Sequence, residues 1–249
     1  MKRFFLTLTV IATVGLVGFA SIIAYVDPFF HYHKPIEGFP YVVDDQVDMN
    51  PGLARNMDYD GVLLGSSMTV NFTASSFERD MGLKLQKLSY NGAYPRDQYN
   101  IMEQVFEYHP SVKRVFLGID ELNYSADVNE TKYPVTDYLY DNNPVNDVKY
   151  LLNKDVMLDY VLKPLVDRSD ATDWDMIYPM WWKPEHYNLA NVRLYYTPAE
   201  EIKDTTPLEE YIAGIEKNLD TNIIPFIEEH PDTEFTIFYP PYSILYWYD

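Results

Sequence analysis

The chain has 249 residues, 47% of them hydrophobic, which is enough for one domain with its own core. It carries 19 basic and 38 acidic residues, and the formal net charge of −19 argues against a nucleic-acid ligand, which needs clustered Lys and Arg. The chain has no cysteine, which excludes disulfides, thiolate metal sites and cysteine nucleophiles. Its chemistry must therefore come from oxygen and nitrogen groups.

An uncharged apolar run at residues 4–26 predicts a membrane anchor. At about 1.5 Å per residue, a helix over this run is long enough to cross a bilayer. Both basic residues of the tip, 1–3, precede the run and the next basic residue is Lys34, so the tip is expected in the cytoplasm and the domain outside the cell. A cleaved signal peptide is the alternative, but residues 22–25 are a poor cleavage site. We predict an uncleaved, single-pass anchor in the cell membrane.

The rest of the chain alternates between strand and helix patterns. Short apolar runs that end in glycine or polar residues predict parallel strands at 61–65, 85–90, 114–119 and 234–239. Helices are expected from Ser75 in a capping box, from Pro95, and from Pro207 until Pro225 interrupts it. Two successive units of helix, His-Pro and strand indicate parallel strands covered by helices.

These elements define the expected domains. Residues 27–57 are interpreted as a juxtamembrane segment and 58–249 as an α/β domain, with an insertion at 121–205. The insertion is expected to contain helices near 144–152 and 155–166. In a three-layer α/β domain such an insertion usually covers the strand carboxyl ends, so it is a candidate lid or substrate wall.

Three short motifs follow the first three predicted strands. They are Gly65-Ser66-Ser67-Met68, Asn91-Gly92 and Gly118-Ile119-Asp120. In this order they resemble the blocks of the SGNH/GDSL hydrolase superfamily, which implies a three-layer, flavodoxin-like parallel sheet. The resemblance implies that Ser67 is the nucleophile and that Ser67, Gly92 and Asp120 stand at the oxyanion positions. Taken without the other motifs, the Gly-Ser-Ser sequence also fits a plain turn and helix cap.

The chain departs from the family pattern at two places. Asp120 stands where the family has Asn, and an ionised carboxylate repels an oxyanion. The family's Asp-x-x-His block, which supplies the general base, is absent, because no histidine follows His230. We therefore expect the natural chain to continue beyond Asp249 and this length of it to be nearly inactive.

The segments 27–35 and 141–144 are similar to those of exported, membrane-anchored SGNH-like proteins of Gram-positive bacteria. That group is related to the D-alanyl-lipoteichoic acid transfer protein. The resemblance implies a serine esterase or acyltransferase acting on esters of envelope glycan or teichoic acid, with a membrane acyltransferase as a partner. The alternative function is a non-catalytic, membrane-tethered module that binds glycan or scaffolds an acyl-transfer complex.

Further residues are candidates for contacting the substrate. Ser66 adjoins the predicted nucleophile, and Trp181, Trp182 and His186 lie in an aromatic part of the insertion that could stack on sugar rings. No cofactor or metal is expected. His31 and His33 share a face in an extended segment and could bind a metal together, but anchoring at the membrane interface is the commoner role.

Overall fold

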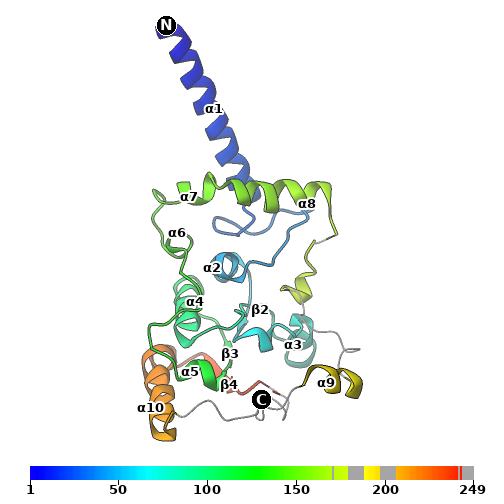
Figure 1. Ribbon diagram of the computed structural model, residues 1–249, viewed down its shortest axis with the longest axis vertical. Helices are drawn as coiled ribbons and strands as arrows, with labels where there is room; N and C mark the ends of the chain where they lie inside the picture. Colours follow the sequence, from blue (N-terminus) through cyan, green and yellow to red (C-terminus); the bar gives the residue numbers. More distant parts are fainter. Residues whose placement is uncertain (170, 179–187, 197–205, 241, 243–249) are drawn as a thin grey trace.

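The computed structural model describes residues 1–249 except 170, 179–187, 197–205, 241 and 243–249 (Figure 1). A long helix, α1 (Lys2–Val26), projects from an α/β body. The body contains a four-stranded, all-parallel sheet in the order β2-β1-β3-β4, formed by β1 (Gly61–Leu64), β2 (Leu85–Lys87), β3 (Arg114–Gly118) and β4 (Glu234–Phe238). The α/β class, the four strand positions and their parallel direction are confirmed.

The register places equivalent strand positions side by side. Leu63 of β1 pairs with Lys87 of β2 and with Phe116 of β3, and Phe116 pairs with Thr236 of β4. Because side chains alternate along a strand, every second residue faces the same side of the sheet. Val62 and Leu64 therefore face the main core, whereas Leu63 faces a smaller one.

Helices cover both faces of the sheet. The main core lies between the sheet and α2 and α4, and the smaller core lies under α3. The helical elements are α2 (Gln46–Asn56), η1 (Ser67–Thr69), α3 (Ala74–Met81), α4 (Pro95–Tyr108), α5 (Glu121–Tyr124), α6 (Asp137–Tyr140), α7 (Val148–Leu151), η2 (Val156–Leu162), α8 (Lys163–Val166), η3 (Trp174–Met176), α9 (Leu189–Tyr195), α10 (Leu208–Asn218), η5 (Leu219–Ile223) and α11 (Ile224–Glu229).

Helix α1 has the length and composition of a membrane span. It has 25 residues with a mean hydropathy of 2.2 in its most apolar window, and most of its side chains are exposed. Ile23 and Val26 in its last turn are the exception, because they belong to the main core of the body. The helix is thus fixed to the domain at one end and free of protein contacts along most of its length.

The segment 27–57 packs into the same core as the rest of the domain. Met49 and Leu53 of α2 are fully buried there. Gly52 is required, because a β-carbon at this position would lie 2.0 Å from the backbone oxygen of Phe29. The sequence boundary expected at residue 57 therefore does not separate two packing units.

The insertion does not cover the strand carboxyl ends along the part that holds α6, α7, η2 and α8. These helices lie toward the base of α1, and α7 and η2 pack directly against it (Figure 1). A lid role for the helices expected near 144–152 and 155–166 is therefore wrong. Apolar residues such as Val156 and Val161 join the same core as Ile23, and this contact holds the insertion at the anchor.

One expected helix start differs from the structure, and one expected interruption agrees with it. Helix α3 begins at Ala74 after Thr73, because the backbone and hydroxyl of Ser75 bind Asp175 instead of capping the helix. The predicted interruption at Pro225 is confirmed. The residues before it, η5, have the wider π-helical turn, and Pro225 lies in the first turn of α11, where its missing N–H costs no helical hydrogen bond.

Candidate active site at the strand carboxyl ends

The parallel strands bring the predicted site residues to one edge of the sheet. Ser67 follows β1, Gly92 follows β2, Asp120 follows β3, and Tyr242 comes shortly after β4. Figure 1 shows that α5, which begins directly after Asp120, lies at the end of the molecule away from α1. We refer to this region as the strand-carboxyl edge.

A tight turn after β1 carries the predicted nucleophile. Gly65 has φ = +146°, and a β-carbon there would lie 2.5 Å from Cγ2 of Thr69. Ser66 is buried; its backbone oxygen accepts hydrogen bonds from the amide and hydroxyl of Thr69, and its hydroxyl accepts one from the amide of Met68. Ser67 is the first residue of the 3-10 turn η1 and is half-buried. Ser66 therefore stabilises the turn, and Ser67 is the serine closer to solvent.

Two polar residues of the neighbouring segment, Lys87 in β2 and Ser89 just after it, bind this turn. The hydroxyl of Ser89 lies 2.8 Å from the hydroxyl of Thr69, and Nζ of Lys87 donates to the backbone oxygen of Val70 at 2.7 Å. Lys87 is only 1% exposed, and burial lowers its pKa to about 8, a shift opposed by Asp175. Sequence analysis missed these residues, although alternation along β2 places Leu85, Lys87 and Ser89 on one side.

Gly92 adopts a left-handed conformation beside a lysine. Its φ is +69°, and a β-carbon at Gly92 would lie 3.1 Å from Cε of Lys132 and 3.6 Å from its Nζ. Asp97 positions both segments, because its Oδ2 accepts hydrogen bonds from the amides of Tyr94 and Lys132 at 2.9 Å. Lys132 is exposed, so an ammonium group lies beside the predicted oxyanion donor, which sequence analysis did not foresee.

Asp120 is buried at the end of β3. It is 5% exposed, and its Oδ1 accepts a hydrogen bond from the hydroxyl of Tyr242. Its Oδ2 is buried and has no hydrogen-bond partner among the described residues. A buried oxygen without a partner costs roughly 1–3 kcal/mol, so this group retains an unused capacity to accept a hydrogen bond.

The described histidines all lie away from this edge. His109 and His230 follow the carboxyl ends of α4 and α11 and precede β3 and β4, which places them at the opposite edge of the sheet. Nε2 of His109 lies 3.1 Å from the backbone oxygen of Arg55, and His230 stacks on Phe106 with 3.7 Å between ring centroids. The other candidate substrate contacts, Trp181, Trp182 and His186, lie outside the described residues.

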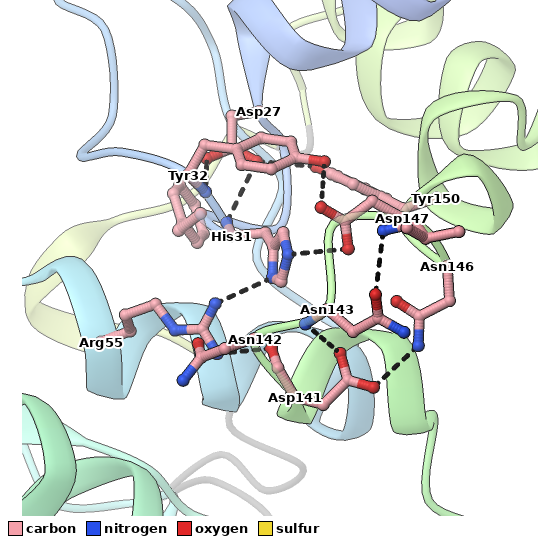
Figure 2. A network of polar contacts seen from close by, with 12 residues as sticks. Asp27, His31, Tyr32, Arg55, Asp141, Asn142, Asn143, Asn146, Asp147 and Tyr150 are labelled. Atoms are coloured by element: carbon pink, nitrogen blue, oxygen red, sulfur yellow. Dashed lines mark hydrogen bonds and ion pairs between the residues drawn. The ribbon is translucent and has the colours of Figure 1, made fainter.

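A second polar group, the juxtamembrane cluster, lies at the base of α1 and consists of Asp27, His31, Tyr32, Arg55, Asp147 and Tyr150 (Figure 2). Asp27 caps α1 in a left-handed conformation and is fully buried. Its carboxylate accepts hydrogen bonds from the amides of His31, Tyr32 and His33 and from the hydroxyl of Tyr150, all within 2.7–3.0 Å. Burial raises the pKa of Asp27, and these hydrogen bonds oppose the shift.

His31 occupies the centre of the juxtamembrane cluster. Its Nε2 lies 3.5 Å from Oδ1 of Asp147, and its Nδ1 lies 3.4 Å from Nη1 of Arg55. Burial, and then the charge of Arg55, lowers the pKa of His31 against the opposing effect of Asp147. The ring of His33 instead contacts the backbone oxygens of Lys34 and Ala24. Among the described residues, no group of three or more His, Asp or Glu could hold a metal ion.

Comparisons with known proteins give no relative for this chain. No family model, no curated protein and no solved structure matches it. The geometry of the two polar regions is therefore the basis for a functional proposal.

Proposed function

We propose that this chain is a membrane-anchored, SGNH-like serine esterase or acyltransferase that acts outside the cell on ester groups of cell-envelope glycans or teichoic acid. One observation carries the proposal: Ser67 is presented, half-buried, on a tight turn at the same sheet edge as Gly92 and Asp120. Ligands of open α/β sheets bind at this edge, outside the strand carboxyl ends.

The proposed chemistry is transfer of an acyl group through Ser67. Its Oγ attacks the ester carbonyl while a base takes the hydroxyl proton, and the proton then passes to the leaving alcohol as the ester C–O bond breaks. The amides of Ser67 and Gly92 serve as oxyanion donors, and the ammonium of Lys132 adds positive charge beside Gly92. Water or a glycan hydroxyl then takes the acyl group from Ser67.

The general base must come from outside the described residues. The four described histidines lie away from the strand-carboxyl edge, and the fifth histidine of the chain, His186, lies outside the described residues. A partner protein that reaches this edge is the other source. Asp120, with one free buried oxygen, can accept a hydrogen bond from such a base or from the substrate.

Labelling with a fluorophosphonate probe tests the proposal. Full-length protein in membranes should label at Ser67, and Ser67→Ala should remove the labelling and lower turnover on the order of a thousandfold or more. Ser125→Ala is the matched control, because Ser125 ends α5 near the same edge and its hydroxyl donates only to the backbone oxygen of Leu122 among the bonds described. Labelling that survives in Ser67→Ala contradicts the proposal.

The distance of the described histidines from the edge favours a second candidate. Without a base, the same edge would act as a non-catalytic module that binds glycan or scaffolds an acyl-transfer complex, with Trp181 and Trp182 as stacking residues. In that case a purified envelope glycan should bind wild-type protein and Ser67→Ala equally, and neither should react with the probe.

A further inference from the structure

A helical stretch runs across the base of α1. Elements η2 and α8 follow each other without a break and lie crosswise to α1, between it and the rest of the domain (Figure 1). One side of this stretch is buried: Val156, Met157 and Val161 join the main core together with Ile23 and Val26 of α1. The opposite side therefore faces the direction in which α1 projects.

That opposite side is unusually apolar. Leu158, Leu162 and Leu165 are spaced by three or four positions and are 53%, 46% and 51% exposed, and Val166 is 90% exposed. Ahead of them, Val145 and Val148 are 79% and 51% exposed. Large apolar residues at helical spacing form one stripe, and a stripe left exposed marks an interaction surface. We call Leu158, Leu162, Leu165 and Val166, which lie on the continuous stretch of η2 and α8, the apolar stripe.

The charge around the apolar stripe differs from that of the whole chain. The stretch 156–166, formed by η2 and α8, holds one basic and one acidic residue, whereas the chain has 19 basic against 38 acidic. An acidic protein is repelled by an anionic membrane surface, and this stretch is locally relieved of that repulsion. Long lysine side chains such as Lys154 can also extend along apolar material while the ammonium stays in water.

The apolar stripe lies where α1 would leave a bilayer. Helix α1 packs against α7 and η2 through its last turns only. Tyr25, just before the end of α1, is 70% exposed, and tyrosine is enriched at the membrane–water interface. The polar domain begins directly afterwards, at the buried cap Asp27. The surface of the bilayer and the apolar stripe are thus at the same level along α1.

The geometry points to a second membrane contact: the apolar stripe lies in the outer surface of the lipid bilayer, with its side chains roughly 5–10 Å into the boundary between headgroups and acyl chains. This inference rests on the membrane-spanning role of α1 in the proposed function. The occupant of the stripe is lipid, since its neighbour α1 is exposed and apolar along the same side of the molecule. The contact fixes the orientation of the domain above the membrane.

Site-directed fluorescence tests this contact, because the chain has no cysteine to remove. Leu162→Cys, labelled with an environment-sensitive dye in the full-length protein, is placed in vesicles of phosphatidylcholine and phosphatidylglycerol. We expect a blue-shifted emission and a loss of fluorescence when the lipids carry a spin label close to the headgroup. Leu208→Cys is the matched control, a 70% exposed leucine on α10, which should show neither effect.

A third variant separates failure of the inference from failure of the anchor. Leu16→Cys reports on α1 itself: Leu16 is 55% exposed and lies about 15 Å along the helix from Val26, so it is read with lipids that carry the spin label near the end of the acyl chain. Quenching at Leu16→Cys without quenching at Leu162→Cys overturns the stripe contact and leaves the anchor in place. Quenching at neither position overturns both. A blue shift at Leu162→Cys that spin-labelled lipid does not quench shows that protein, such as a second copy of the chain, covers the stripe, and also overturns the inference.

Discussion

The juxtamembrane cluster and the strand-carboxyl edge each contain a buried aspartate, Asp27 and Asp120, and the two carboxylates differ in how completely they are paired. Both oxygens of Asp27 accept hydrogen bonds inside the protein (Figure 2). At the strand-carboxyl edge, one oxygen of the buried Asp120 has no partner among the described residues. A carboxylate with both oxygens paired inside the protein stabilises the fold, whereas a carboxylate with one unpaired buried oxygen can still accept a hydrogen bond from a ligand.

Two segments that carried the family resemblance, 27–35 and 141–144, belong to the paired region and have a structural role there. Arg55 of α2 bridges the segments 27–35 and 141–144, since it donates both to Nδ1 of His31 and to the backbone oxygen of Asp141. Tyr32 adds a hydrogen bond to Asp147 at 3.0 Å. The cluster therefore joins the start of the domain to the insertion. A distinctive polar motif is thus compatible with a purely structural role.

The largest effect should come from removing the centre of the juxtamembrane cluster. Asp27→Ala leaves three amides and one hydroxyl without an acceptor, and each orphaned buried donor costs about 1–3 kcal/mol, so the free energy of unfolding should fall by about 3 kcal/mol or more. Thermal unfolding of the full-length protein in detergent, followed by tryptophan fluorescence, measures the loss. Asp27→Asn keeps one acceptor oxygen and should lose less. A loss in Ser67→Ala as large as that in Asp27→Ala would remove the distinction between the regions.

The next effect concerns the buried lysine beneath the strand-carboxyl edge. Because the pKa of Lys87 is lowered from 10.5 to about 8, the unfolded chain binds more protons than the folded one between these values, and stability should rise with pH there. At about 1.4 kcal/mol per unit, the full rise is about 3 kcal/mol. Lys87→Met should abolish the rise, as urea unfolding at pH 8 and above can measure. Lys84→Met, at an exposed lysine, should retain the rise of stability with pH. An unchanged rise in Lys87→Met would contradict the prediction.

The smallest effect should come from His31. Its pKa is lowered in the fold, so below about pH 6.5 the unfolded chain binds more protons than the folded chain. The free energy of unfolding should therefore fall as the pH is lowered, by at most about 1.4 kcal/mol per pH unit. Asp147 opposes the shift and limits its size. His31→Gln should flatten the dependence between pH 5 and pH 7 in thermal unfolding, and His230→Gln should retain it. An equally steep dependence in His31→Gln would assign it to another group.

Much of the fold could be predicted from local patterns, because buried parallel strands are short apolar runs and the anchor is a long one. The helix α2 and its packing could not be predicted from local patterns. Its sequence contains Pro51 and the buried polar residues Gln46 and Asn50, and it is helical because Asp45 caps it and Gly52 permits close contact with Phe29. These causes lie in contacts between distant residues. The position of α7 and η2 beside α1 depends in the same way on contacts between distant residues.

The candidate site was predictable only in part. Glycine and serine after a buried strand indicate a functional turn, which located Ser67, Gly92 and Asp120 at one edge. The proximity of Lys132 to Gly92 depends on a loop tied down by Asp97, and no local pattern predicts it. Lys87 was missed because an isolated lysine usually lies at the surface, and here it is retained in the core by one hydrogen bond.

The junction between α1 and the domain has a mechanical consequence. The helix enters the core at Ile23 and Val26, and Asp27 reverses the chain at once, so no flexible stalk separates anchor from domain. With α1 upright in a bilayer, the strand-carboxyl edge stays at a constant height on the side away from the lipid (Figure 1). A tilt of the domain in the membrane would then require α1 to tilt with it. Under the proposed function, an acyl donor held at the lipid surface would need a carrier to reach Ser67, whereas a long envelope polymer would reach it unaided.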